Sequence, residues 1–473
     1  MKKNRGSVGL CLILSIILLL SACGVNAPAG DRTGTSDVPQ AQETESGTGP
    51  AVRDEAYATK LKSYGIELPV SRTRISVNQS GYSASRDKEV IFLGDSYGDT
   101  FRVVRKSDNK VVRVGRINAA QTDGLSGQTV SICDFSQVTE PGSYYIETDI
   151  IGQSYPFEIS EDAYERLFLG LLANMSDARL EESAKGVCDV SFGMHILLYS
   201  LQKNGALYEQ AYAYMGDAAA DGDMVARLLY MAQWLLTKQG EDGSLYGDYE
   251  ATAAFCGIMA MGRNTFGKYE ATVSKELQDA AERAWQWLAG NACDSGERRA
   301  ARFYAAMQLL DATGNREYRQ IVDEFLAGYE GSYTADRFVF YGVWVCLNAE
   351  QNIDRDTCTH IMLCLVDETE QICNEAEKDE LFGIGERSLE NTLRRVLLLC
   401  FINYITPSKE YTLIVENSIQ YIGGLNETGE CHIGPDGRWR DTDASLERNF
   451  EWNGIVLFCF GDMLKNINDM AEE

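Results

Sequence analysis

The sequence predicts an all-β sandwich followed by an all-helical region, and two changes in its apolar pattern support that prediction. Between Arg74 and Ile159 apolar and polar residues alternate in short runs, whereas after Asp162 apolar residues recur at helical spacing to the end. A chain of 473 residues with 45% hydrophobic content can bury more than one core. We therefore expect at least two domains.

Seven short runs make up the first region, and turn-forming clusters separate them. The stretches from Ser107 to Asn109 and from Glu140 to Gly142 are such clusters, because Asp, Asn, Pro and Gly favour tight turns. Runs of this length and spacing are typical of a β-sandwich. The expected strands lie at 75–82, 89–95, 100–106, 111–117, 128–135, 142–149 and 154–160.

The second region consists of amphipathic segments with apolar residues at i, i+3, i+4 and i+7. Their connections are short, which favours helices that pack in pairs. The clearest of these segments lie at 166–175, 194–202, 224–237, 280–289, 395–405 and 452–464.

The first 23 residues have the pattern of an export signal. Lys2, Lys3 and Arg5 precede an apolar stretch, and the sequence from Leu20 to Cys23 resembles a bacterial lipobox. That resemblance implies acylation of Cys23 and a lipid anchor at the bacterial cell membrane or cell surface. An ordinary cleaved signal and a short anchor helix are the alternatives.

Residues 24–70 predict a flexible tether, because their first part is rich in Gly, Pro, Ser, Thr and acidic residues. The whole chain has 43 Lys and Arg against 70 Asp and Glu, a net charge of −27. Such an acidic surface argues against nucleic acid as a partner and against adsorption to anionic lipid headgroups.

The cysteines predict no metal site. Cys358, His360, Cys364 and Cys373 form the one metal-like cluster, but their spacing matches no zinc pattern, and the apolar residues between them suggest a core helix. We expect no cofactor, while calcium and disulfide pairing stay open. Several other cysteines lie in apolar runs, where Cys behaves as a small hydrophobic residue.

One carboxylate stands out near the C-terminus, in the stretch from Asp441 to Leu457. Glu447 lies on a polar segment that leads into an apolar helix, and Phe450 and Trp452 follow it. A carboxylate beside aromatic rings suits a general acid that acts on a sugar. It equally suits a solvated helix entrance, where acidic residues interact favourably with the helix dipole.

The stretch from Val77 to Tyr82, VNQSGY, resembles the opening of the immunoglobulin-like module that precedes the barrel in family 9 glycoside hydrolases. CDFS at 133–136, PGSYY at 141–145 and YPFEI at 155–159 resemble the later strands of that module in the same order. The resemblance implies an immunoglobulin-like sandwich at residues 71–160. An unrelated sandwich is the alternative.

Several helical segments carry the same resemblance. Residues 223–236, 251–255 with 264–266, 306–314 and 419–426 are similar to helices of the family's catalytic domain. The resemblance implies that residues 161–473 form an all-α (α/α)6 barrel. It also implies inverting hydrolysis of β-1,4-glucans, with a polysaccharide or oligosaccharide as the partner.

The resemblance also assigns the acid. The family's acid lies in a motif like NEVAIDWNA, and Trp452-Asn453-Gly454 matches its end, which places Glu447 on the general acid. Leu446 and Arg448 depart from the motif on either side of it. An arginine alongside a carboxylate favours its ionised form, which is unfavourable for an acid.

The family's catalytic base is missing from its expected place. The family carries the base in DVSGGWYDAGDxxKFG, whereas this chain reads DVSFG from Asp189 to Gly193 and lacks DAGD. Asp189 is the nearest remaining carboxylate, and we expect it to cap or orient a turn. Asp436, Asp441 and Asp443 are further carboxylates near Glu447 in the sequence.

The substrate cleft also departs from the family. The PHHR motif is absent, and the segment before residue 251 is short. The aromatic candidates for stacking on sugar rings are Tyr246, Tyr304, Trp439 and Trp452, and core packing is the alternative for Trp452 as for Trp344.

The two histidines outside the cysteine cluster have separate expectations. His195 follows the start of a helical segment, and we expect it to be packed in the core. His432 stands alone in a polar loop, and we expect it on the surface.

Two functions remain open. In the first, the protein is a degenerate family 9 scaffold that has lost its base and is retained for glycan binding or surface interaction. In the second, it is an active hydrolase on a short or atypical β-glycan, with a relocated base and Glu447 as the acid.

Overall fold

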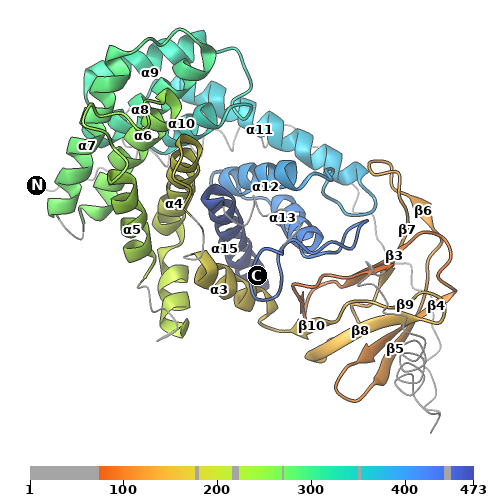
Figure 1. Ribbon diagram of the computed structural model, residues 1–473. Coiled ribbons are helices and arrows are strands. Elements are labelled where there is room, and N and C mark those ends of the chain that lie inside the picture. Colours follow the sequence, from red (N-terminus) through yellow and green to blue (C-terminus); the bar gives the residue numbers. More distant parts are fainter. Residues whose placement is uncertain are drawn as a thin grey trace, which may run out of the picture. The chain divides into compact units, whose positions relative to one another are not determined.

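The computed structural model describes residues 74–175, 180–215, 223–268, 271–349, 353–440 and 449–472 (Figure 1). The export signal with Cys23, the tether, Asp441, Asp443 and Glu447 lie outside the described residues. The expectations for them stay predictions. Residues 68–403 and 407–473 form one compact unit, which holds both the strands and the helices.

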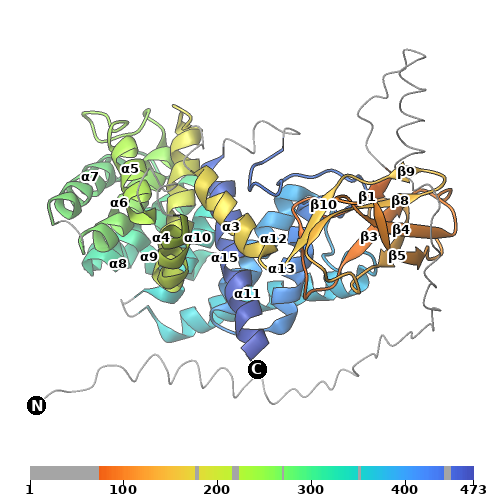
Figure 2. The same ribbon diagram turned by 90° about the horizontal axis from the view of Figure 1, so that it is seen from below.

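The first part of the described chain is a sandwich of two sheets, as its alternating pattern predicts. The first sheet has the order β1 (Ile75–Ser76), β3 (Glu89–Leu93), β7 (Thr129–Asp134), β6 (Gln121–Thr122). The second has the order β2 (Tyr82–Ser83), β10 (Phe157–Ser160), β8 (Gly142–Thr148), β4 (Thr100–Arg105), β5 (Lys110–Arg116), and β9 (Gly152–Gln153) pairs with β8. Figure 2 shows β3 and β4 in this sandwich.

The sandwich core is built around Tyr82. Its ring lies 5.2 Å from the ring of Phe135 and 5.2 Å from that of Phe157, in both cases edge to face. Its hydroxyl donates a hydrogen bond to the carbonyl of Glu89 and accepts one from the backbone N–H of Asn78. The VNQSGY stretch therefore closes the core with an aromatic ring whose polar end is fully satisfied.

Helices make up the rest of the described chain. They alternate between helices that are buried almost all round, such as α6 and α8, and helices that bury one stripe, such as α7 and α9. The helices are α3 (Ala163–Asn174), α4 (Ala184–Met215), α5 (Met224–Leu236), α6 (Tyr249–Phe266), α7 (Ala271–Gly290), α8 (Gly296–Thr313), α9 (Arg316–Gly328), α10 (Arg337–Asn348), α11 (Arg355–Lys378), α12 (Leu389–Asn403), α13 (Lys409–Ile422) and α15 (Phe450–Glu472).

The buried helices α4, α6, α8, α10, α12 and α15 form the inner layer, and each follows an outer helix in the sequence. Asp248, Ser295 and Asp336 cap the N-termini of α6, α8 and α10 with side-chain hydrogen bonds to backbone N–H groups. None of the described helices combines the length and apolar character needed to span a membrane.

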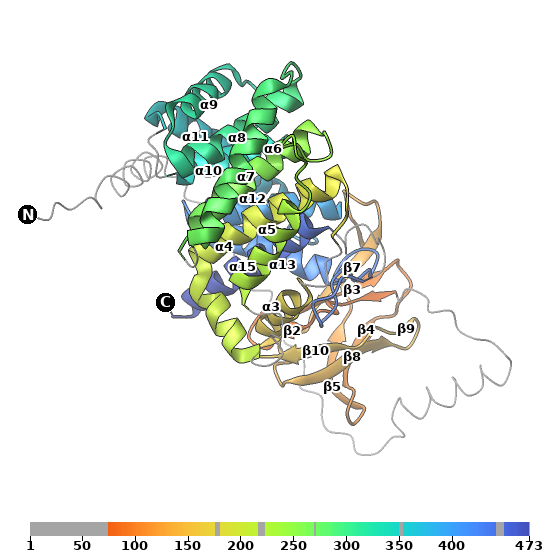
Figure 3. The same ribbon diagram turned by 60° about the vertical axis from the view of Figure 1, so that its left-hand side comes forward.

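Helices α4 and α15 pack side by side, as Figure 3 shows. A Cβ at Gly193 would lie 2.6 Å from the carbonyl oxygen of Phe450, and Gly454 faces the same Gly193. Glycine at these positions therefore allows the two backbones to approach closely. This contact brings the N-terminal halves of the two helices together at one end of the inner layer.

Arg387 joins the sandwich to the helices. It donates hydrogen bonds to both carboxylate oxygens of Asp123 in the sandwich and to both of Asp379 at the end of α11. Its guanidinium also lies 4.4 Å from the ring centre of Phe382. An apolar cluster surrounds this ion pair, with Ile91 and Val130 from the sandwich among its members.

The Asp123 carboxylate predicts an acid-sensitive contribution to stability. Burial would raise its pKa, but the hydrogen bonds from Arg387 and Ser126 outweigh burial and lower the pKa to about 2. A carboxylate with a lowered pKa in the folded state stabilises the protein above its ordinary pKa, and that stabilisation disappears as the pH falls through the lowered value.

We therefore expect Asp123→Asn to lower the free energy of unfolding at neutral pH by about 1.5–3 kcal/mol. The deficit should shrink between about pH 4 and about pH 2. Urea unfolding across this range measures both effects. Asp108→Asn is the control, because the ion pair of Asp108 with Arg105 and its hydrogen bond from the backbone N–H of Lys110 are both exposed in the same sandwich. A deficit independent of pH would contradict the role given to Asp123.

Candidate functional site

Three charged residues meet where the first turns of α4, α10 and α15 converge. Arg337, the first residue of α10, donates from Nη1 to Asp189 Oδ1 of α4 at 3.2 Å and to Glu451 Oε2 of α15 at 3.2 Å. Tyr341, one turn further along α10, donates its hydroxyl to Glu451 Oε1 at 2.9 Å. One guanidinium thus connects three inner helices.

Both carboxylates of this group are buried, and burial raises the pKa of Asp189 and of Glu451. Arg337 acts in the opposite direction on both, and Arg394 on Glu451 and Lys185 on Asp189 add smaller effects of the same sign, but burial outweighs these cations. Burial alone would lower the pKa of Arg337, and the two carboxylates outweigh it and raise that pKa. The group therefore favours the uptake of one proton.

The arrangement of the two carboxylates around one guanidinium does not suit inverting hydrolysis. Asp189 Oδ1 and Glu451 Oε2 both lie 3.2 Å from the same nitrogen, so they are at most twice that distance apart. An inverting pair of carboxyl groups is about 6.5–9.5 Å apart, with room between them for water. Here the guanidinium occupies the space between the two carboxylates.

Helix α4 runs without a break through the DVSFG segment. Phe192 is fully buried, its ring is stacked 4.7 Å from the ring of Tyr341, and the Arg337 guanidinium lies 4.9 Å from its ring centre. The expectation that Asp189 caps or orients a turn is wrong, since Asp189 lies inside α4 and binds Arg337.

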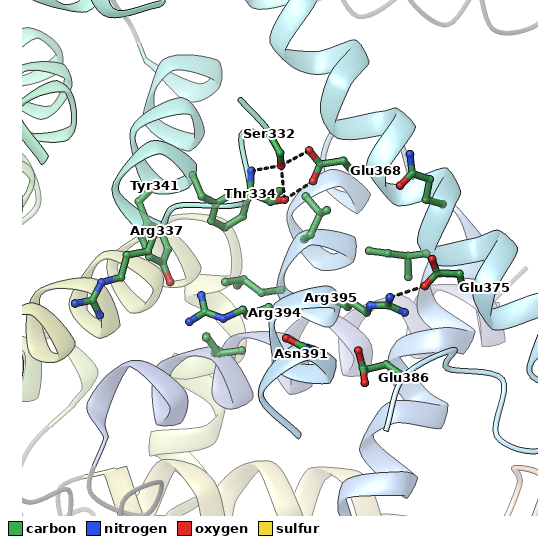
Figure 4. A pocket seen from close by; sticks show the side chains of 16 residues that line it. Ser332, Thr334, Arg337, Tyr341, Glu368, Glu375, Glu386, Asn391, Arg394 and Arg395 are labelled. Atoms are coloured by element: carbon green, nitrogen blue, oxygen red, sulfur yellow. Dashed lines mark hydrogen bonds and ion pairs between the residues drawn. The ribbon is translucent and has the colours of Figure 1, made fainter. Parts of the chain in front are cut away.

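A pocket of about 580 Å³ lies between α10, α11 and α12 (Figure 4). The C-terminal halves of α10 and α12 are in contact, with Trp344 stacked 4.3 Å from Phe401. Toward their N-termini the two helices both line the pocket, which Arg337 and Tyr341 border on one side and Arg394 on the other. The pocket therefore adjoins the Arg337 group.

Polar groups in the pocket wall are held in place by their neighbours. Glu368 on α11 accepts hydrogen bonds from the hydroxyls of Ser332 and Thr334. Arg395 on α12 binds Glu375 and donates to the carbonyl of Gly385 at 3.1 Å. Figure 4 shows these groups facing the same hollow from different elements.

The connection between α11 and α12 contributes Glu386 to the pocket wall. Glu386 accepts hydrogen bonds from the backbone N–H groups of Arg387 at 2.7 Å and of Ser388 at 2.8 Å, and these bonds help to lower its pKa below the usual range although burial opposes them. Glu386 therefore enters the pocket as a fixed, ionised acceptor.

Comparison with known proteins identifies the fold. Residues 71–153 match the family described as the cellulase N-terminal ig-like domain. Along most of its length the chain is similar to Endoglucanase D of Acetivibrio thermocellus, with 22% identity over 76% of this chain and 72% of that protein. A cellodextrinase of Butyrivibrio fibrisolvens is also 22% identical, over 77% of this chain and 85% of that protein.

Comparison with solved structures identifies the same fold. A metagenome-derived glycoside hydrolase family 9 endoglucanase has a TM-score of 0.66 at 17% identity and covers 82% of this chain and 98% of its own. A family 9 protein of Bacteroides ovatus has a TM-score of 0.63 at 16% identity and covers 82% of this chain and 98% of its own. The chain has the fold of a family 9 glycoside hydrolase.

The family 9 fold confirms the predicted fold class, an immunoglobulin-like sandwich followed by an (α/α)6 barrel. The inner helices α4, α6, α8, α10, α12 and α15 are the inner ring of that barrel. The Arg337 group and the pocket lie at the N-terminal halves of these inner helices.

The predicted site residues lie in different surroundings. Glu447 lies outside the described residues, two residues before them. Tyr304 is fully buried in α8, where its ring packs on Gly257 and its hydroxyl lies 3.2 Å from His195 Nδ1. No face of Tyr304 is open to a sugar, so the stacking role expected for it is wrong.

Trp439 and Trp452 lie beside the start of α15 and are mostly buried. Trp439 donates from Nε1 to Asn453 Oδ1 at 2.9 Å, and the Arg394 guanidinium lies 5.2 Å from the ring centre of Trp452. Tyr246 alone among the four aromatic candidates is well exposed, at 51%, in the loop before α6. Its φ of 56° places it in the left-handed region.

His195 and His432 differ in how deeply they are buried. His195 is packed in the core as expected, and burial lowers its pKa to about 3. His432 is half-buried, and burial lowers its pKa as well, so it is less exposed than the expected surface position. Cys358 and His360 lie on α11, and the described cysteines are free thiols.

Sequence reasoning missed Arg337, Tyr341 and Glu451. Glu451 had a signal, because it occupies the aspartate position of the NEVAIDWNA motif that placed Glu447. Arg337 and Tyr341 had none, since nothing in the sequence of α10 says which of its faces meets α4 and α15. Their roles depend on a contact between segments more than 100 residues apart.

Removal of the shared cation should be costly. We expect Arg337→Met to lower the free energy of unfolding by about 3–5 kcal/mol, because it leaves two buried carboxylates without a partner. Arg395→Met is the control, since its partner Glu375 is half exposed and free to be hydrated. Urea unfolding at neutral pH compares the two variants. Equal losses in the free energy of unfolding for the two variants would contradict the role of Arg337 as the shared partner of Asp189 and Glu451.

The raised pKa of Glu451 predicts that Glu451→Gln stabilises the protein, in contrast to Arg337→Met. A raised pKa in the folded state means that the free energy of unfolding falls as the pH rises above the ordinary value of 4.5. Gln retains an acceptor for Tyr341 and leaves Arg337 with Asp189 alone.

We therefore expect Glu451→Gln to become more stable than the wild type above pH 4.5, by a difference in the free energy of unfolding that grows as the pH rises. Unfolding curves at a series of pH values measure this difference. Glu330→Gln, at an exposed position before α10, is the control. A difference that shrinks as the pH rises would refute the assignment of a raised pKa to Glu451.

Proposed function

We propose that the protein is a cell-surface glycan-binding protein with the family 9 fold, in which the hydrolytic base has been lost. The observation that carries this proposal is the replacement of the base segment by an unbroken helix whose carboxylate, Asp189, is bound to Arg337. A general base must accept a proton from water, and a carboxylate held by a guanidinium beneath packed rings is poorly placed to do so.

The second buried carboxylate supports the same conclusion. Glu451 is bound on one side by Arg337 and on the other by Tyr341, so neither of its oxygens is presented to a ligand. The guanidinium of Arg337 also binds both Asp189 and Glu451, where an inverting pair needs room for water between its carboxyl groups. Loss of general base catalysis costs about 10²–10⁴-fold in rate, and loss of substrate positioning adds to this.

Glycan binding is supported by the relatives and by the pocket. The similar proteins include endoglucanases and a cellodextrinase, and one structural neighbour at a TM-score of 0.62 is described in complex with a cellobiose-like isofagomine. The polar pocket beside Arg337 offers this chain a place for a polysaccharide end or an oligosaccharide.

The export pattern supports a surface location. The lipobox-like sequence ending at Cys23 would anchor the processed chain to the membrane, and residues 24–70 would hold the sandwich away from it. Mass spectrometry of the membrane fraction tests this part, because acylation of Cys23 adds lipid mass that Cys23→Ala cannot carry.

The alternative is an active hydrolase on a short or atypical β-glycan. Helix α15 begins at Phe450, and Glu447 precedes it by three residues in the sequence, at the position that the family motif gives to the acid. Asp441 and Asp443 precede it and would be the sources of a relocated base. This alternative requires one of them to activate water.

Release of reducing ends from a panel of β-glucans separates the two functions. We expect no release above the buffer rate, and the same rate for the wild type and for Glu447→Gln. Binding of the same glycans, measured by calorimetry, should persist in both proteins. Release that exceeds the buffer rate and falls by 10²-fold or more in Glu447→Gln would overturn the proposal in favour of the hydrolase.

A further inference from the structure

We propose that the pocket between α10, α11 and α12 binds a short, uncharged saccharide. This inference rests on the proposed glycan-binding function and adds to it the location of the ligand and its chemical class. The pocket is lined by the inner helices α10 and α12, by Ile455 of the inner helix α15 and by the outer helix α11.

The size of the pocket fits a small ligand. Its volume of about 580 Å³ lies within the range of about 300–1,000 Å³ that is typical of small-molecule sites. The stacked pair of Trp344 and Phe401 closes the space between α10 and α12 at the C-terminal end of these helices. A volume of this size suits an oligosaccharide or a chain end.

The charges of the lining favour a neutral ligand. Glu368, Glu375 and Glu386 line the pocket, and so do three arginines, so the formal charges cancel. An anion would meet three carboxylates, and the arginines already hold ion pairs: Arg337 with Asp189 and Glu451, Arg394 with Glu390, Arg395 with Glu375. A cation would meet the three guanidinium groups. A ligand with neither charge avoids both costs.

The polar groups of the lining suit a polyol. Glu368 and Glu386 are acceptors whose positions are fixed by hydrogen bonds from their neighbours. Asn391 and Gln371 add amide donors and acceptors. A sugar hydroxyl both donates and accepts, so a ring with several hydroxyls can use carboxylates, amides and guanidinium groups at the same time.

The lining also has an apolar part that suits a sugar ring. Tyr341, Phe340, Ile372, Leu397, Leu398 and Ile455 contribute it, next to the polar groups. Ring C–H groups of a saccharide can pack on such a surface while the hydroxyls at the ring edge reach the polar wall. This combination of surfaces also distinguishes the pocket from a site for a small inorganic ion.

The wall that carries Glu386 is anchored to the sandwich. Arg387, the next residue, is held by Asp123 of the sandwich and by Asp379, and Asp379 also accepts the backbone N–H groups of Ile384 and Gly385. The connection between α11 and α12 is therefore a rigid part of the pocket. A preformed wall reduces the entropy cost of ligand binding.

Calorimetry on the full chain tests the inference with four probes: cellotetraose, laminaritetraose, xylotetraose and tetragalacturonic acid. Asn391→Trp is the decisive variant, because Asn391 is exposed on α12 and an indole there would fill the pocket without disturbing the core. Asn374→Trp is its control, since the same change is made at an exposed position of α11 outside the lining.

We expect at least one neutral tetrasaccharide to bind the wild type and Asn374→Trp equally, and to bind Asn391→Trp at least tenfold more weakly. Equal binding to the wild type and to Asn391→Trp would overturn the location while leaving the proposed function intact. Absence of binding of every probe to the wild type would overturn both. Tighter binding of tetragalacturonic acid than of the neutral probes would overturn the ligand class.

A second pair of variants tests the wall. Glu368→Gln retains the shape of the side chain but replaces a charged acceptor, and we expect it to weaken binding of the neutral saccharide about tenfold. Glu370→Gln, at an exposed position of the same helix outside the lining, should bind like the wild type. Unchanged affinity of Glu368→Gln would overturn the contact assigned to Glu368.

Discussion

The ion pair of Arg337 with Asp189 and Glu451 is the constraint on which the mouth of the barrel depends. Two buried carboxylates and a partly buried guanidinium are expensive to desolvate, and they persist only where each has a partner at hydrogen-bond distance. Because the three residues come from α4, α10 and α15, their pairing sets how these helices approach one another. The close contact of Gly193 with Phe450, one turn further along the same face of α4 as Asp189, is compatible with the same approach.

The same constraint limits the chemistry. A carboxylate becomes a useful base or acid when its pKa is tuned and its oxygen faces the reacting group. Burial raises the pKa of both carboxylates here, but Arg337 binds one oxygen of Asp189, and Arg337 and Tyr341 together bind both oxygens of Glu451. A perturbed pKa in this cleft therefore reflects a structural ion pair, which is a common origin of such shifts.

The fold was predictable from the sequence to a large extent, and the site was not. The switch from period two to helical spacing near Asp162 sets the boundary between the domains, and local patterns are enough to predict it. Asp189 was expected in a turn because its family counterpart precedes a loop, but removal of that loop let α4 continue through it. Tyr304 shows the same limit, because its burial depends on Gly257 of another helix.

The course of α4 determines which part of the barrel mouth is filled. As α4 runs through the DVSFG segment, Phe192 stacks on Tyr341 and Arg337 binds Asp189, so this part of the mouth holds rings and paired charges. The space that remains open adjoins Arg337 and Tyr341 and extends toward α11 and α12. A ligand in this pocket would therefore lie beside carboxylates that Arg337 already binds, which are poorly placed to act as a base.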